Sequence, residues 1–140
     1  MEPANPGFPS EPTRPGSAND SSTGMRILLV EDNPDIARVL ATLLTRAGHA
    51  VTIASTMVQA EHIASTSGAF ELLISDLSLP DGSGLELKRR LGPIPGIAVS
   101  GYSTDVDLQE CRDAGFLELL TKPVEFAALQ EIIQRISRKG

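Results

Sequence analysis

The sequence predicts an α/β fold in which five parallel strands form a doubly wound sheet with helices on both faces. Five short runs rich in Ile, Leu and Val recur along the chain, as expected of buried parallel strands. Between them lie segments whose apolar residues recur every three or four positions, which is typical of helices packed through one face. Strands that alternate with helices are joined by right-handed crossovers, and such connections produce a parallel sheet.

The predicted elements follow one another from residue 26 towards the end of the chain. Pro34 suits the first turn of the first helix, and Gly48 suits its C-terminal cap. Gly115 closes the fourth helix, and Lys and Arg in the last turn of the fifth complement its dipole. The strands are predicted at residues 26–30, 50–54, 72–76, 97–100 and 116–121. The helices are predicted around residues 34–47, 57–64, 84–91, 108–114 and 129–136.

Composition excludes several classes of protein. The chain has 140 residues, of which 41% are hydrophobic and 21% charged, and this suits one globular domain with a core. It has no apolar run near the roughly 20 residues of a membrane span, and it shows no secretory signal. A formal charge of -6 argues against direct nucleic-acid binding, and one Cys argues against an internal disulfide. We therefore expect a cytoplasmic protein without membrane insertion.

Residues 1–24 differ in composition from the rest of the chain. Proline recurs at every third position from Pro3 to Pro15, and Gly, Ser and Thr follow. Proline at this period lies on one edge of a polyproline II helix, so one interpretation is a ligand for a proline-binding module. The favoured interpretation is a disordered Pro/Ser-rich tail or linker, because this composition cannot bury a core. The globular domain is then expected at residues 25–140.

Polar side chains follow the ends of four predicted strands. Glu31 and Asp32 come after the first strand, Asp76 ends the third, Ser100 ends the fourth and Lys122 follows the fifth. The flavodoxin-like strand order 2-1-3-4-5 is a common solution at this length, and it makes these four strands neighbours. Ligands bind at the carboxyl ends of such strands. The five side chains are therefore expected to meet on one rim of the sheet.

These residue types indicate a metal-assisted phosphoryl site. Adjacent carboxylates such as Glu31 and Asp32 repel each other, and oxygen ligands of this kind favour Mg²⁺. The carboxylate of Asp76 can attack phosphorus, and the ammonium of Lys122 can act as a point charge for phosphate. Each residue also has an ordinary structural interpretation: the acid pair as a helix cap, Asp76 as a turn former, Lys122 as a surface lysine. Asn33 already suits the helix cap, which weakens that interpretation for the acid pair.

Taken in order, the motifs resemble the receiver domain of bacterial two-component response regulators. The similarity covers residues 25–139, and each motif alone is weak whereas the ordered set is specific. The motifs that carry it are Leu28-Leu29-Val30-Glu31-Asp32-Asn33, Ser75-Asp76-Leu77-Ser78-Leu79-Pro80-Asp81-Gly82, Ser100-Gly101 and Leu120-Thr121-Lys122-Pro123.

The resemblance implies a separate role for each rim residue. Asp76 would accept a phosphoryl group from a phosphohistidine on a sensor histidine kinase or a phosphotransfer protein. Mg²⁺ would be held by Glu31, Asp32, Asp76 and the backbone carbonyl of Ser78. Ser100 and Lys122 would bind the phosphoryl oxygens, with Ser100 moving towards them as the switch residue. The implied protein is not an enzyme but a phosphoacceptor regulatory domain that catalyses its own phosphoryl transfer and loses the group slowly.

One position departs from the family pattern. Many receivers carry Tyr or Phe three residues before the lysine, and here that position is Leu119. The sequence leaves open how the signal passes on, with Tyr102 as one candidate for an aromatic role and an ordinary loop residue as the plainer interpretation. The output is expected through a downstream protein target or a homodimer, using the face formed by the fourth helix, the fifth strand and the fifth helix.

Two other functions compete with the signalling switch. One is a Mg²⁺-dependent phosphohydrolase with an aspartyl-phosphate intermediate, although Ser78 occupies the position where a second acid would be expected. The other is a docking receiver that is never phosphorylated, against which the complete set of rim residues argues. No effector domain is expected after the fifth helix, so the chain is interpreted as a stand-alone receiver or as the receiver portion of a hybrid histidine kinase.

The remaining chemically distinctive residues have structural interpretations. Cys111 lies on the apolar stripe of the fourth helix and is predicted to be a small buried residue. His49 and His62 have no ligand partners nearby in sequence. The triplet Lys88-Arg89-Arg90 is predicted to be the solvated end of a short helix.

Overall fold

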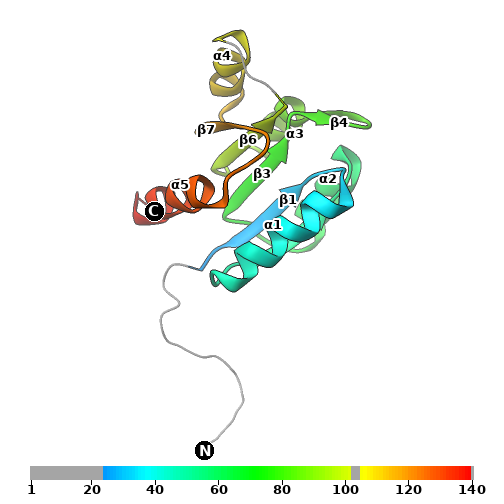
Figure 1. Cartoon of the computed structure of the whole chain (residues 1–140). Helices are drawn as coiled ribbons and strands as arrows, with labels where there is room; N and C mark the ends of the chain where they lie inside the picture. The colour runs from blue at the N-terminus through cyan, green and yellow to red at the C-terminus, as the bar shows by residue number, and fades with distance from the viewer. Residues whose placement is uncertain (1–23, 102–104, 140) are drawn as a thin grey trace, which may run out of the picture.

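The computed structural model describes residues 24–101 and 105–139 (Figure 1). The predicted Pro/Ser-rich tail, residues 1–24, lies outside the described residues except for Gly24, so it stays a prediction. Tyr102 also lies outside them, and its part in signalling is therefore untested. Within the described ranges, no helix is both long and apolar enough to cross a membrane.

The main sheet has five parallel strands in the order β2-β1-β3-β6-β7, which confirms the predicted doubly wound arrangement. The order equals the predicted 2-1-3-4-5, because β4 and β5 belong to a separate small hairpin. The last strand begins two residues later than expected, since the amide of Phe116 donates to the Cys111 carbonyl and thereby closes the preceding helix. The strands of this sheet are β1 (Arg26–Val30), β2 (Ala50–Ala54), β3 (Leu72–Asp76), β6 (Gly96–Ser100) and β7 (Glu118–Thr121).

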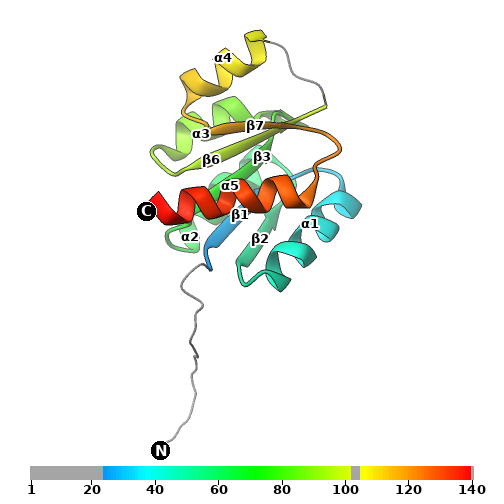
Figure 2. The same cartoon turned by 60° about the vertical axis from the view of Figure 1, so that its left-hand side comes forward.

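Helices cover both faces of the sheet (Figures 1 and 2). Asn33 caps the first helix, as predicted, by accepting hydrogen bonds from the amides of Asp35 and Ile36. Gly48, just after this helix, has φ of 104°, a conformation that a side chain would disfavour. The helices are α1 (Pro34–Arg46), α2 (Met57–Thr66), α3 (Gly84–Leu91), α4 (Asp105–Ala114) and α5 (Phe126–Lys139).

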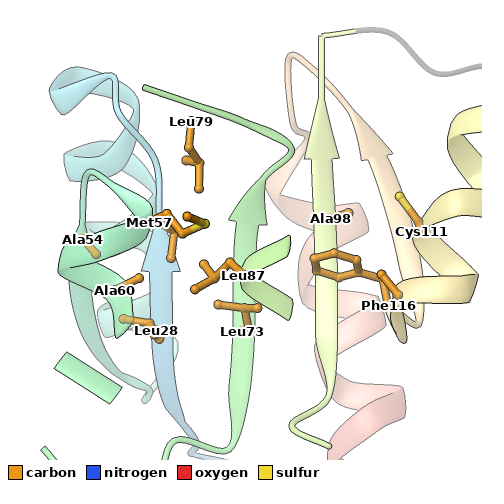
Figure 3. Packing of buried hydrophobic residues seen from close by; sticks show 12 residues of the cluster. Leu28, Ala54, Met57, Ala60, Leu73, Leu79, Leu87, Ala98, Cys111 and Phe116 are labelled. Atoms are coloured by element: carbon orange, nitrogen blue, oxygen red, sulfur yellow. The ribbon is translucent and has the colours of Figure 1, made fainter. Parts of the chain in front are cut away.

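Two hydrophobic clusters hold these layers together, one on each face of the sheet. Alternate residues of β3 show the division, because Leu73 joins one cluster while Leu72 and Ile74 join the other. The first cluster takes side chains from α2, α3 and α4, and part of it appears in Figure 3. It includes Cys111, which is buried as predicted. The second cluster takes side chains from α1 and α5. The central strands β1, β3 and β6 are thus largely buried, whereas the edge strands β2 and β7 are partly exposed.

A short antiparallel hairpin follows β3, where the sequence indicated only a turn. Its strands are β4 (Ser78–Leu79) and β5 (Gly82–Ser83), and Ser78 pairs with Ser83. Pro80 and Asp81 form its two-residue tip. Ser83 then caps α3 by accepting a hydrogen bond from the amide of Glu86 at 3.1 Å. The hairpin therefore connects the end of β3 directly to the start of α3.

The prediction that the basic triplet is a solvated helix end is wrong for Lys88. Arg89 and Arg90 are exposed, but the Lys88 side chain is buried, with 3% of the residue accessible. Its Nζ donates to the carbonyl of Gly92 at 2.7 Å, beyond the end of α3. Burial lowers the pKa of Lys88. Its aliphatic stem packs by Gly96 and its ammonium by Gly115, two glycines whose lack of a side chain leaves space for it.

Candidate functional site

The acid pair lies in the tight connection between β1 and α1. The amide of Glu31 donates to the Ala54 carbonyl at 3.0 Å, which extends the pairing of β1 with β2 by one residue. The Glu31 carboxylate turns back and accepts a hydrogen bond from the amide of Asn33 at 3.0 Å. Glu31 is buried whereas Asp32 is exposed. The connection thus places the Glu31 carboxylate in the buried part of the site and the Asp32 carboxylate at its solvent-exposed surface.

Asp76 ends β3 at the centre of the rim, and only 6% of it is accessible. Its Oδ1 accepts a hydrogen bond from the amide of Ser78 at 3.2 Å. Behind it, the Ser75 hydroxyl donates to the Asp76 backbone carbonyl at 2.9 Å. Gly84 lies against that same carbonyl, so closely that any side chain at position 84 would collide with it. The Asp76 carboxylate is thus bound by the Ser78 amide, and the Asp76 backbone carbonyl lies between the Ser75 hydroxyl and the start of α3.

Lys122 follows β7, an edge strand of the sheet, and brings a positive charge to the rim. Its Nζ donates to Asp76 Oδ2 at 2.7 Å and lies 3.3 Å from Glu31 Oε1. Its backbone amide donates to the carbonyl of Ser100 at 2.7 Å, and the peptide bond to Pro123 is cis. Burial acts to lower the pKa of Lys122, but the hydrogen bond and charge of Asp76, with the charge of Glu31, outweigh it and raise the pKa. The lysine is therefore held as an ammonium between two carboxylates.

The three carboxylates form the kind of cluster that can hold a metal ion. Glu31, Asp32 and Asp76 each offer an oxygen, and these oxygens all lie within 4.8 Å of one another. Burial, assisted by the charge of Asp76, raises the pKa of Glu31 despite the hydrogen bond from Asn33 and the charge of Lys122. One lysine cannot balance three acids, so the cluster retains excess negative charge. Hard oxygen donors with that charge fit Mg²⁺.

The structure brings together most of the residues that the sequence placed at the rim. Glu31, Asp76 and Lys122 are in direct contact, and Asp32 joins them through the carboxylate cluster. Ser100 ends β6 and is bonded through its backbone to Lys122, so it lies on the same rim. Ser78, whose carbonyl is the remaining predicted ligand, begins the hairpin two residues after Asp76 and is exposed.

Sequence reasoning missed Asp81, which it treated only as part of a turn. The Asp81 carboxylate accepts hydrogen bonds from the amides of Met57 and Val58, at 2.7 and 3.0 Å. These bonds join the hairpin to a helix that lies more than twenty positions earlier in the chain. A local signal for it was present, since Asp after Pro often marks a turn, but the helix partner could be identified only in three dimensions.

An apolar groove opens beside the carboxylates, with a volume of about 510 Å³. Ile36 and Val39 of α1 line one side, and Pro123 and Val124 after β7 line the other. Lys122 lies at its edge. The two α1 side chains are partly exposed, at 38% and 57%. A hydrophobic surface thus adjoins the charged site directly.

The fold and the rim together define a class of protein: a doubly wound α/β domain with an acidic pocket at the carboxyl ends of its strands, paired with one lysine. Comparison with protein families agrees, because the family model of the response regulator receiver domain matches residues 27–134. The chain belongs to the response regulator receiver domain family.

Individual relatives support this assignment. The chain is 33% identical over 121 residues to the two-component response regulator ARR10 of Arabidopsis thaliana, a match covering 84% of the chain. It spans only 22% of the length of ARR10.

Solved structures show the same fold. The receiver domain of sensor histidine kinase PA1611 from Pseudomonas aeruginosa PAO1 is 31% identical with a TM-score of 0.73, and the match covers 82% of this chain and 98% of that one. That structure has a magnesium ion coordinated in its active site cleft. The non-phosphorylated HemR receiver domain from Leptospira biflexa is 27% identical with a TM-score of 0.73, covering 80% of this chain and 93% of that one.

Proposed function

We propose that the chain is a phospho-accepting signalling switch in which Asp76 receives the phosphoryl group. The observation that carries this proposal is the contact of Asp76 with Lys122 beside two further carboxylates. A carboxylate oxygen of Asp76 attacks phosphorus, an acyl phosphate bond forms and the P–N bond of a phosphohistidine breaks. The donor imidazole keeps the electron pair of that bond. A sensor histidine kinase or a phosphotransfer protein supplies the phosphohistidine, as expected for this family.

The residues around Asp76 each favour this transfer. The Lys122 ammonium now pairs with Asp76 Oδ2, and it can follow the negative charge onto the phosphoryl oxygens as the carboxylate is esterified. Ser100, on the neighbouring strand, offers a hydroxyl to the same oxygens. Glu31, Asp32, Asp76 and the Ser78 carbonyl would hold Mg²⁺, which when bound supplies positive charge to the transferring group. The magnesium ion in the PA1611 relative supports this choice of metal.

The apolar groove suits the approach of the donor protein. A phosphohistidine must come within bonding distance of Asp76, so the protein that carries it must cover the surface beside the rim. Ile36 and Val39 lie there, next to Lys122, and they would lose contact with water when a donor covers them. The groove therefore supports a protein donor in addition to small phosphodonors.

The signal is proposed to leave through the face formed by α4, β7 and α5. Ser100 ends β6 and pairs with Thr121 of β7, so a movement of Ser100 towards a phosphoryl group reaches this face directly. Leu119, in place of an aromatic residue, packs against the first core cluster and limits the relay to a smaller rearrangement. The readout is a downstream protein target or a homodimer.

We infer a cytoplasmic protein, stand-alone or part of a hybrid kinase, in which residues 1–24 are a tail or linker.

Substitution of Asp76 tests the proposal. The full chain should gain one phosphoryl group with acetyl phosphate and Mg²⁺, measured by intact-mass spectrometry, and Asp76→Asn should gain none because the amide is a poor nucleophile. Asp113→Asn, an exposed acid on α4, is the matched control and should be phosphorylated normally. Failure to modify the unaltered chain would overturn the proposal. Rapid multiple turnover of phosphate esters would instead indicate a phosphohydrolase.

A further inference from the structure

The hairpin tip is attached to α2 through a carboxylate. Asp81 Oδ1 accepts from the Met57 amide at 2.7 Å, and Oδ2 accepts from the Val58 amide at 3.0 Å. The Thr56 hydroxyl accepts a hydrogen bond from the Gln59 amide at 3.0 Å. Each of the first three backbone amides of α2 therefore has a side-chain acceptor. The hydrogen bonds from Val58 and Met57 lower the pKa of Asp81, which keeps it ionised near the positive end of the helix. Two of these three hydrogen bonds are therefore accepted by Asp81, a residue of the distant hairpin.

The base of the same hairpin is attached to the phosphoryl site. Ser78 begins the hairpin, and its amide donates to Asp76 Oδ1. Across the hairpin Ser78 pairs with Ser83, which caps α3. Only Leu79 and Pro80 separate Ser78 from Asp81 along the chain. The tip and the Ser78 carbonyl are therefore joined by a very short span of chain.

Apolar packing beneath the hairpin could also hold the hairpin on α2, independently of the Asp81 hydrogen bonds. Leu79 and Met57 are both buried in the first core cluster, where they lie near each other above Leu87 (Figure 3). The Met57 side chain fills the space beside Gly82, where any side chain would come within 2.8 Å of its Cε. Packing of this kind is not directional, whereas a carboxylate that binds two amides fixes both distance and orientation. The hydrogen bonds are therefore better suited to set the position of the tip.

We propose that Asp81 is a positioning residue for the metal site. By fixing the hairpin tip on the start of α2, it holds the Ser78 carbonyl at the place where that oxygen completes the ligands offered by Glu31, Asp32 and Asp76. This inference rests on the proposed function, because it takes Mg²⁺ as the ligand of that site. It assigns the strength of Mg²⁺ binding in part to a side chain that would not touch the ion.

The test compares two variants that damage the same helix end. Asp81→Ala removes the link between hairpin and helix, and Thr56→Ala removes a cap of α2 without touching the hairpin. Isothermal titration of the full chain with Mg²⁺ should show binding roughly tenfold weaker in Asp81→Ala, the low end of the range for residues behind metal ligands. Thr56→Ala should bind Mg²⁺ as the unaltered chain does, although both variants should melt at lower temperature.

Two further measurements separate positioning from general loss of structure. Asp81→Asn keeps one acceptor oxygen, so its Mg²⁺ affinity should fall between those of the unaltered chain and Asp81→Ala. Phosphorylation of Asp81→Ala by acetyl phosphate should be slow at low Mg²⁺ and recover at saturating Mg²⁺, because the nucleophile and Lys122 remain in place.

The outcomes also separate this inference from the proposed function. If the unaltered chain binds no Mg²⁺, the proposed function itself is wrong. If it binds Mg²⁺ and Asp81→Ala binds it equally well, only the positioning role is overturned. Equal weakening in Thr56→Ala would assign the effect to the stability of α2 and would likewise overturn the role of Asp81.

Discussion

At the scale of single residues, burial and charge act in opposite directions at Glu31. Burial raises its pKa, and this is the largest influence, whereas the Asn33 amide and the charge of Lys122 act to lower it. The folded protein therefore binds the Glu31 proton more tightly than the unfolded chain does. Ionised Glu31 lowers the free energy of unfolding in the absence of metal. A cation bound beside Glu31 would act in the opposite direction, because it would favour the ionised carboxylate.

Glu31→Gln should raise the free energy of unfolding of the metal-free protein at pH 7.5. Glutamine removes the buried charge but keeps a similar shape. The gain is complete above the raised folded pKa, and it should disappear below the ordinary Glu pKa of 4.5, where the carboxyl is protonated in both states. Urea unfolding in EDTA at pH 7.5 and pH 4.0 measures this difference. Glu110→Gln, at an exposed position on α4, is the control, and an equal gain in that variant would contradict the explanation.

Most of the candidate site could be predicted residue by residue, because strand ends in a parallel sheet must share one edge. Glu31, Asp76 and Lys122 follow from that rule together with the strand order. Lys88 and Asp81 could not be predicted in this way. Lys88 is buried because Gly96 and Gly115, from different segments, leave space beside it, and Asp81 finds its partners on α2. Both outcomes depend on packing between elements, which local patterns do not contain.

At the scale of elements, the start of α3 lies behind Asp76, the proposed phosphoryl acceptor. Gly84 is the first residue of α3, and its amide donates to the Leu77 carbonyl at 3.0 Å. A β-carbon there would meet the carbonyl of Asp76 and would come within 2.9 Å of the Ser75 hydroxyl. The sequence predicted the bounds of α3 correctly from the stop signal after it. It could not show that α3 begins against the backbone of the central strand.

Gly84→Ala should therefore destabilise the protein, although alanine favours helices over glycine. The collision is with backbone, which cannot rotate away, and overpacking of this kind costs about 1–3 kcal/mol. Urea unfolding measures the change in the free energy of unfolding. Gly101→Ala, where a β-carbon would meet open space, is the matched control and should cost much less. A Gly84→Ala protein as stable as the unaltered chain would show that α3 can move away without penalty.

At the scale of the whole molecule, the two hydrophobic clusters lie on opposite faces of the sheet. The site at the strand ends contacts both sides, because α1 begins beside Glu31 and α3 begins behind Asp76. The periodicity of apolar residues predicted this architecture, because each strand and helix of the main sheet is long enough to show it. The β4–β5 hairpin was not predicted, because strands of two residues are too short to leave a periodic signal.

Phosphorylation should change self-association if the readout is a homodimer. Sedimentation velocity of the full chain with Mg²⁺ and acetyl phosphate should then show a larger species than without the phosphodonor. Arg135→Glu should weaken that species, because Arg135 lies at the α5–β7 face, where it is 3.7 Å from Glu118. Arg46→Glu, at the end of α1, should have no effect. An acyl phosphate that leaves sedimentation unchanged would count against the homodimer and favour a separate target.

The order of the site residues along the chain has a consequence for biosynthesis. Lys122 is 46 residues later than Asp76, and all three carboxylates precede it. A ribosome makes the chain from its N-terminus, so the acids are completed before the residue that pairs with them. Until residue 122 is made, the lysine that contacts Asp76 and Glu31 in the folded protein is missing from the chain. The ion pairs at the rim can therefore form only after β7, the strand that precedes Lys122, has been synthesised.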